Sequence, residues 1–249
     1  MTDTRLEGIS IQLYSLRVEA AADLEHVIDR LAKAGYDAVE AAGFGRLNST
    51  AFMQLVTDKG MSVSGSHIHL PDPGETQKLL DSQAGLGNTD LIVAFLPPEQ
   101  FASADAVAET AEQLNAFNLE VRERGCTLSY HNHWFEFTSK IDGEPAYISL
   151  FEQLEPTIYA ELDTYWAQTG GSDPAKLVAE FSERARLLHI KDGPADDPDS
   201  SMVALGNGIM DIPAILAASQ AIWHIVELDR CDTDMFEAVE QSITYLRSL

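Results

Sequence analysis

The apolar positions along the chain alternate between two patterns. Short, often β-branched apolar segments are each followed by a longer segment whose apolar residues recur every three to four positions, as in an amphipathic helix. The predicted strands lie within residues 8–16, 37–43, 61–70, 90–97, 126–134, 158–166, 185–193 and 222–229. The predicted helices follow within residues 23–35, 49–60, 75–87, 104–125, 146–156, 173–184, 211–221 and 234–249.

This alternation predicts a fold class. Strands that alternate with helices imply a parallel sheet, and eight units in 249 residues fit the usual size of a (β/α)8 TIM barrel. No linker divides the sequence, so we expect one barrel domain over residues 1–249. A doubly wound open sheet is the competing architecture, but the first strand-to-helix turn lacks the glycine-rich sequence usual in that fold. The turn-rich stretch 191–208 is expected to be a functional loop.

Composition and charge narrow the class of protein. The chain has 16 basic and 40 acidic residues, a net charge of −24, and such a surface repels nucleic-acid phosphates. No apolar run approaches the ~18 residues of a membrane span, and the N-terminus lacks a signal-peptide pattern. Cys126 and Cys231 are too few for a disulfide framework. We expect a cytoplasmic protein that binds neither nucleic acid nor membrane.

The polar residues at the strand ends are the candidate site. Active sites of barrel enzymes lie at the carboxyl ends of the strands, and side chains two positions apart share a strand face. This rule pairs His67 with His69, His131 with His133, Glu161 with Asp163, His189 with Lys191, and Glu227 with Asp229. A strand-end acid can instead cap a helix or pair with a lysine, and we favour that interpretation for Asp192 and Asp229.

Three of these residues end consecutive strands. Neighbouring strands lie about 4.8 Å apart, so Asp163, His189 and Glu227 can meet at one point. Carboxylates and imidazoles without a thiolate suit a divalent ion such as Mn, Mg, Co or Zn. Burying these carboxylates together without a cation would be costly. The sequence therefore predicts a divalent-metal site.

Residues 129–137, SYHNHWFEF, combine histidines, a glutamate and aromatic side chains. A histidine can exchange protons near neutral pH, and Glu136 is expected on a loop from which it can reach a substrate hydroxyl. His133 and Glu136 are therefore the expected proton-transfer residues, with Glu227 or Glu161 next.

The remaining candidates would contact the substrate. Trp134 and Trp166 offer flat surfaces for a sugar ring, and His67 and His69 are also expected to bind substrate. Lys191 is expected either to neutralise an enolate oxygen or a substrate anion, or to pair with Asp192 or a carboxylate of the barrel.

The segments YHNHWFEF, ELDTYWAQTGGSDP, LLHIKDG, GNG and VELD resemble the sugar phosphate isomerase/epimerase family of xylose isomerase-like barrels. Inosose dehydratases and ketose 3-epimerases are relatives, and the resemblance runs from about residue 8 to the end. It implies one divalent metal held at the ends of strands five to eight. Asp163, His189 and Glu227 match the last three ligands. His131 stands where the epimerases have a glutamate and is the expected fourth ligand, with Glu136 or Glu161 as alternatives.

The resemblance also implies an activity. We expect a metal-dependent isomerase or epimerase that abstracts a proton next to a carbonyl of a keto-sugar or polyol derivative, with a homo-oligomer compatible with the sequence. Trp166 replaces a substrate-binding histidine of the epimerases, and the paired histidines are closer to those of inosose dehydratases. The alternatives are therefore a dehydratase or β-eliminase acting on an inosose or 3-keto-glycoside, and a non-catalytic sugar-binding barrel. Endonuclease IV-like activity is not expected, because its additional metal ligands are missing.

Overall fold

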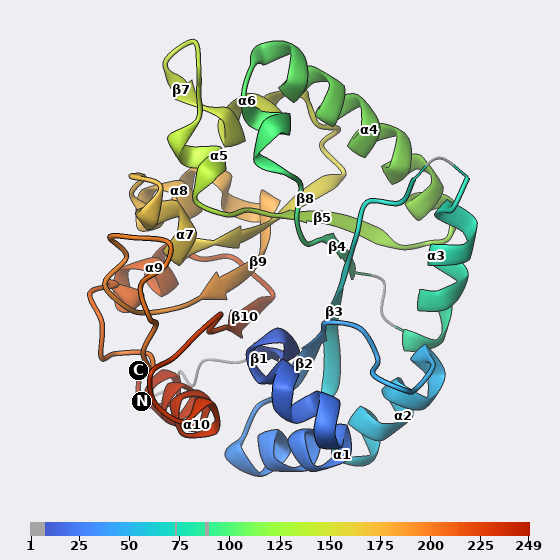
Figure 1. Cartoon of the computed structure of the whole chain (residues 1–249), viewed down its shortest axis with the longest axis vertical. Helices are drawn as coiled ribbons and strands as arrows, with labels where there is room; N and C mark the ends of the chain where they lie inside the picture. The colour runs from blue at the N-terminus through green and yellow to red at the C-terminus, as the bar shows by residue number, and fades with distance from the viewer. Residues whose placement is uncertain (1–7, 73, 88–89) are drawn as a thin grey trace.

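The computed structural model describes residues 8–72, 74–87 and 90–249. Within these residues, eight parallel strands form a closed barrel surrounded by helices (Figure 1). Around the barrel the order is β1 (Ile9–Gln12), β10 (Trp223–Val226), β9 (Ala185–Ile190), β8 (Ile158–Asp163), β5 (Thr127–His131), β4 (Asp90–Val93), β3 (Ser62–Ile68) and β2 (Ala38–Ala41). The predicted (β/α)8 barrel is confirmed, and the open-sheet alternative is wrong.

The outer layer consists of the predicted amphipathic helices. They are α1 (Arg17–Ala34), α2 (Ser49–Asp58), α3 (Thr76–Gln83), α4 (Ala104–Glu123), α6 (Ala146–Gln153), α8 (Pro174–Phe181), α9 (Ile212–Ala218) and α10 (Met235–Leu246). Several begin at a residue whose side chain accepts a backbone N–H of the first turn, as Ser103 does for α4 and Asp234 for α10. No helix within the described parts of the chain is both long and apolar enough to cross a lipid bilayer.

Short elements that the sequence pattern did not predict lie between these units. They are the helices α5 (Phe135–Thr138) and α7 (Thr164–Thr169), the 3-10 turns η1 (Leu13–Leu16), η2 (Ala84–Leu86), η3 (Pro98–Phe101) and η4 (Ser182–Arg184), and the strands β6 (Lys140–Ile141) and β7 (Glu144–Pro145). Two of them affect the site directly, because α5 follows β5 and α7 follows β8.

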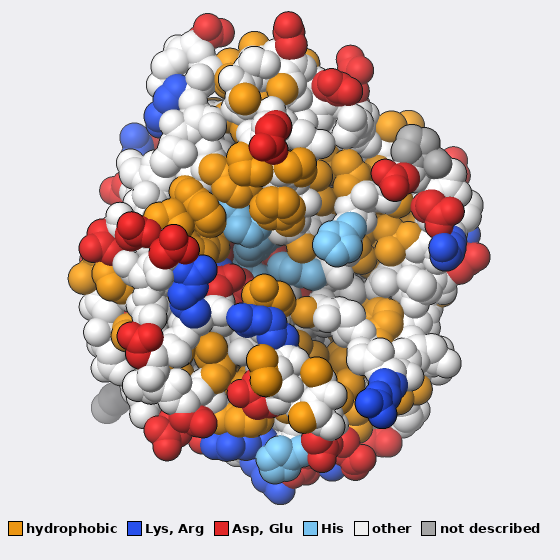
Figure 2. Space-filling view, in the orientation of Figure 1, with side chains coloured by type: hydrophobic (Ala, Val, Ile, Leu, Met, Phe, Trp, Pro, Cys, Tyr) orange, Lys and Arg blue, Asp and Glu red, His pale blue; other side chains and the backbone are white. Residues whose placement is uncertain are grey.

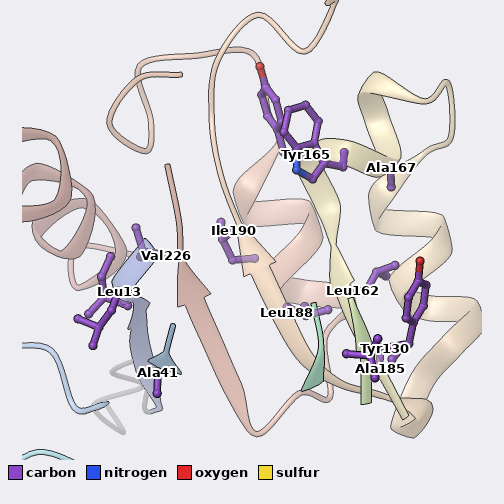
Figure 3. Packing of buried hydrophobic residues seen from close by; sticks show 14 of the residues in the cluster. Leu13, Ala41, Tyr130, Leu162, Tyr165, Ala167, Ala185, Leu188, Ile190 and Val226 are labelled. Carbon is purple, nitrogen blue, oxygen red and sulfur yellow. The ribbon is translucent and has the colours of Figure 1, made fainter. Parts of the chain in front are cut away.

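The barrel strands are buried on both faces. Outward side chains such as Tyr130, Leu162 and Leu188 belong to the large apolar core between sheet and helices (Figure 3). Leu187 and Ile225 belong to a separate small cluster with Ile92. Because these two lie two positions before inward polar residues, the small cluster lines the barrel interior. It forms an apolar floor beneath the polar carboxyl ends of the strands.

Gly65 of β3 makes room inside the barrel. A Cβ at this position would lie 2.5 Å from Ile92 Cδ1 and 3.1 Å from Glu40 Oε1. The first distance is shorter than real Cβ contacts, so a larger residue would displace the apolar floor. Glycine at this position therefore lets Glu40 of β2 enter the interior.

The loop that follows β9 is organised by one carboxylate. Asp192 accepts backbone hydrogen bonds from Gly193 (2.9 Å), Gly206 (2.9 Å), Gly208 (3.0 Å) and Met210 (3.1 Å). The favoured interpretation of Asp192, a helix cap or a lysine partner, is therefore wrong, because its carboxylate binds loop amides instead.

Candidate functional site

The four residues expected as metal ligands converge at the carboxyl ends of the strands. His131 and Asp163 end β5 and β8, His189 lies in β9, and Glu227 directly follows β10. One potential ligand atom from each lies within 4.8 Å of the others, and all four side chains are buried. The strand register explains this, since Asp163 is paired with His189 across neighbouring strands.

A second group of potential ligands overlaps the first. It consists of His67, His131, Glu161 and His189. Glu161 Oε2 lies 2.6 Å from His67 Nε2, 3.1 Å from His131 Nδ1 and 3.3 Å from His189 Nε2. Glu161 therefore faces the same interior as Asp163, as the alternation rule predicted, and connects β3 with β5, β8 and β9.

Glu40 and Gln12, which were not among the site residues predicted from the sequence, complete the centre. Glu40 Oε2 lies 2.8 Å from His189 Nε2 and 3.0 Å from His67 Nε2. Gln12 donates a hydrogen bond of 2.6 Å to the same oxygen. A histidine ligand usually donates its second ring N–H to an acceptor that fixes the ring, and Glu40 is placed to do this for His189. The signal was present, because Glu40 is the charged residue of the otherwise apolar strand β2.

Lys191 is buried inside the carboxylate cluster. Its Nζ lies 2.9 Å from Asp163 Oδ2, 2.7 Å from Glu227 Oε2 and 2.6 Å from Asp229 Oδ2. Lys191 therefore pairs with carboxylates of the barrel, which is one of the roles expected for it. The favoured interpretation of Asp229, that it pairs with a lysine, is confirmed. The Trp166 ring centroid lies 5.0 Å from the same Nζ.

Asp163 is held in place by its local structure. Its Oδ1 accepts the backbone N–H of Trp166 at 2.8 Å and so caps α7. Its backbone N–H and C=O are bound by the Asn132 side chain at 2.9 and 3.1 Å. These contacts leave Oδ2 directed at the cluster.

The buried charges shift one another's pKa values. Burial lowers the pKa of His67, but Glu40 and Glu161 outweigh it and raise the pKa to about 10. Burial also lowers the pKa of His189, but Glu161, Glu227 and Glu40 outweigh it and hold the pKa well above its usual value. Burial instead dominates at His131 and His133, whose pKa values fall well below the usual value, so both rings are neutral at pH 7.

This donor set fits a divalent cation. Four carboxylates are buried here, those of Glu40, Glu161, Asp163 and Glu227. Among the described residues, Glu40 Oε1 and Glu161 Oε1 are buried without a hydrogen-bond partner. Buried carboxylate oxygens are normally paired or bound to metal. Among the described residues, Lys191 and the protonated rings of His67 and His189 offset part of this negative charge.

An aromatic wall borders the cluster on one side. The His133 ring stacks on Phe135 with centroids 5.5 Å apart and contacts Phe95 edge-on at 5.2 Å. The Trp134 and Trp166 rings lie 5.1 Å apart. Figure 2 shows histidine side chains gathered at the centre of this face, with hydrophobic side chains along one border. Such a wall can exclude water from one side of a bound molecule.

Some predicted site residues lie elsewhere. Glu136 is not on a loop but in α5, where its Oε1 accepts the Tyr130 hydroxyl at 2.6 Å and its Oε2 accepts the His133 backbone N–H at 3.0 Å. The side chain is buried, so the expected reach to a substrate hydroxyl is wrong. The expected pairing of His67 with His69 is also wrong, because β3 ends at Ile68 and His69 is exposed.

Burial also limits two predicted substrate contacts. Trp166 is 3% exposed and Lys191 is fully buried. Neither presents a free surface in this state, because Trp166 packs against Lys191 and Lys191 is paired with carboxylates. Trp134 is half-buried and remains available for stacking.

Sequence comparisons give limited information. No family model matches the chain. The protein FdhE homolog of Cronobacter sakazakii is 28% identical over 184 residues, which cover 73% of this chain and 50% of that protein. The chain thus spans about half the length of the curated relatives it matches, and we draw no function from them.

Solved structures match nearly the whole chain. A sugar phosphate isomerase/epimerase from Parabacteroides distasonis has a TM-score of 0.82 and 25% identity, with 98% of this chain and 95% of that chain covered. The probable 3-DHS dehydratase AsbF of Bacillus anthracis has a TM-score of 0.75 and 13% identity, with 96% and 98% covered. The IOLI protein, solved with a zinc atom, has a TM-score of 0.68 and 14% identity, with 97% and 98% covered. The resemblance to sugar phosphate isomerase/epimerases and xylose isomerase-like barrels, predicted from the sequence, is therefore confirmed by solved structures.

Proposed function

We propose that this protein is a divalent-metal-dependent isomerase or epimerase that removes a proton next to the carbonyl of a keto-sugar or polyol derivative. The observation that carries the proposal is the convergence of His131, Asp163, His189 and Glu227 within 4.8 Å at the carboxyl ends of the barrel strands. The likeness to the Parabacteroides sugar phosphate isomerase/epimerase supports the reaction class.

The four converging side chains are the proposed metal ligands. The buried, unpartnered oxygen of Glu161 and the surplus of carboxylates support a cation here, as does the zinc atom of the IOLI neighbour. When bound, a divalent ion supplies Lewis-acid stabilisation of the negative charge that develops on the substrate oxygen. Glu40 would keep the His189 ring oriented through the 2.8 Å contact at Nε2.

His133 is the proposed base. Its ring lies 5.2 Å from that of His131, and burial keeps it neutral, so it can accept a proton. Its Nδ1 has no hydrogen-bond partner among the described residues. Phe95 and Phe135 would shield the exchanging proton from bulk water. Glu227 is the next candidate, although its Oε2 is already in contact with His189 and Lys191.

Substrate contact is assigned to the accessible edge of the cluster. The His67 side chain is 12% exposed, more than the buried His131 and His189, so it can bind a substrate hydroxyl. Trp134 is proposed as the surface on which the sugar ring packs, since aromatic faces favour contact with apolar ring surfaces.

Elimination is the second candidate reaction, with an inosose or 3-keto-glycoside as substrate. It shares the proton-abstraction step and additionally needs an acid for the departing hydroxyl group. His67 favours this candidate, because its Nε2 lies 3.0 Å from Glu40 Oε2 and 2.6 Å from Glu161 Oε2, and two neighbouring carboxylates favour the protonated imidazole. The dehydratase AsbF is a structural neighbour on the same fold.

The test combines metal loading with solvent exchange. The purified protein is stripped with a chelator, reloaded with Mn, and incubated in deuterated water with keto-sugars, inososes and 3-keto-glycosides, and deuterium incorporation is followed by NMR. Asp163→Asn should lose bound metal and exchange together, whereas His133→Ala should keep the metal and lose exchange. His69→Ala, which changes an exposed histidine outside the cluster, is the control and should keep both. Wild-type protein that binds no divalent ion, or normal exchange in His133→Ala, would refute the corresponding part of the proposal.

A further inference from the structure

Lys191 occupies a pocket formed by three carboxylates. Its Nζ lies 2.6–2.9 Å from Asp163 Oδ2, Glu227 Oε2 and Asp229 Oδ2. The side chain is fully buried, and the Trp166 ring lies against it, with its centroid 5.0 Å from Nζ. A lysine is almost never fully buried unless it is paired, so the ammonium group is fixed between these three oxygens.

The centre offers more ligands than one divalent ion uses. Two four-residue groups share His131 and His189, and between them they add His67, Glu161, Asp163 and Glu227. Asp229 borders the same centre through its contact with Lys191. One zinc ion takes four protein ligands, and a magnesium ion keeps several waters among its six ligands, so six side chains are more than one ion needs. The chain therefore holds enough donors for a second cation position.

We propose that Lys191 is a built-in cation that fills the position of a second divalent ion, so that the centre accepts one ion. This inference rests on the proposed function, because it presupposes that the wild-type centre binds a divalent metal. Three carboxylate oxygens around one point form the kind of site that a hard divalent cation prefers. The ammonium group satisfies the three oxygens with its three N–H donors and places a single positive charge among them.

Removal of the lysine charge should therefore change the metal stoichiometry. Without Lys191, the carboxylates of Asp163, Glu227 and Asp229 would lie together without a positive charge between them. Because Asp163 and Glu227 are buried, their mutual repulsion would be strongly unfavourable. A second divalent ion can restore the balance, because divalent cations bind carboxylate oxygens at about 2.0–2.6 Å. In Lys191→Met, which keeps an unbranched side chain as far as the ε position but lacks the ammonium group, bound Mn per chain should double.

The experiment measures Mn per chain by elemental analysis after dialysis, and electron paramagnetic resonance of the same samples. Wild type should bind one Mn with an isolated-ion spectrum, whereas Lys191→Met should bind two with the spectrum of an exchange-coupled pair. Lys176→Met removes a lysine whose side chain is 72% exposed and should remain at one ion. Lys191→Met combined with Asp229→Asn removes the third carboxylate and should also return to one ion.

The outcomes separate this inference from the function on which it rests. One ion in wild type and one in folded Lys191→Met would overturn the inference and leave the metal site intact. No ion in wild type would overturn the proposed function and this inference with it. Should Lys191→Met fail to fold, Lys191→Gln keeps an N–H donor group without the charge. Lys191→Gln is again expected to bind two coupled ions. A folded Lys191→Gln variant that binds one ion would overturn the inference.

Discussion

The buried carboxyl group of Glu136 gives the fold a testable pH dependence. Burial raises its pKa from 4.5 to about 8, and the hydrogen bonds from Tyr130 and His133 offset only part of this effect. The folded chain thus keeps a proton that the unfolded chain releases above pH 4.5. The unfolded state then binds fewer protons, so stability falls as pH rises from 4.5 to 8. The favourable contribution is complete below pH 4.5 and lost above pH 8.

The size of the effect follows from the shift. At 1.36 kcal/mol per pKa unit, a change from 4.5 to about 8 corresponds to roughly 5 kcal/mol in the free energy of unfolding. Glu136→Gln removes this dependence because glutamine does not titrate. Its amide oxygen can accept the His133 N–H, and its NH2 can donate to the Tyr130 hydroxyl oxygen, so both contacts have a replacement.

Urea unfolding at pH 5 and pH 8 measures the effect. The variant should be close to wild type at pH 5 and more stable by several kcal/mol at pH 8. Glu144→Gln, at an exposed position, is the matched control and should follow wild type at both pH values. Fluorescence and circular dichroism midpoints must coincide for the free energies to be comparable.

Two results would refute this reasoning. A stability difference between Glu136→Gln and wild type that is the same at pH 5 and pH 8 would show that the carboxyl group does not titrate in this range. If Glu136→Gln kept its full metal content but lost solvent-deuterium exchange, Glu136 would have the proton-transfer role that was expected from the sequence. The structure predicts that exchange persists.

Three other changes probe the support of the site. Glu40→Gln should weaken metal binding about 10–100-fold, measured by competition with a chelating dye, because a weaker acceptor would then hold the His189 ring. Gly65→Ala should cost about 1–3 kcal/mol in thermal or urea unfolding, and the further change Ile92→Val should recover part of it, since the new Cβ would meet Ile92. Asp192→Ala should make residues 193–210 susceptible to limited proteolysis, because four loop amides lose their acceptor; unchanged proteolysis would contradict this role.

The fold and the centre of the site could be predicted from sequence for a geometric reason. The alternation of strands and helices determines a parallel barrel, and in such a barrel every inward residue at a carboxyl end points toward the same axis. Asp163, His189 and Glu227 therefore had to converge once their strands were recognised. The inward pairing of Glu161 with Asp163 followed from the two-residue period of a strand.

The missed features lacked a pattern that shows which way a side chain points or which residues it meets. Glu40 lies in a four-residue strand buried on both faces, where apolar residues do not distinguish the inner from the outer face. Glu136 lies in α5, whose N-terminus has no side-chain hydrogen bond at Trp134 that would identify it as a cap. The sequence left two roles open for Lys191, because its state depends on three carboxylates at or beyond the ends of two other strands. The pattern of residues near Lys191 in the sequence does not show which distant carboxylates it meets.

Closure of the barrel links the site to the order of folding. β1 is paired with β10 from Ile9↔His224 to Ile11↔Val226, so the first and last strands complete the ring together. The contact between Glu40 and His189 spans 149 positions of the chain, and such distant contacts are slow to form because the intervening chain must first be ordered. A full ligand set therefore exists only after β10 docks. Metal uptake during refolding would report ring closure and not the folding of any single strand–helix unit.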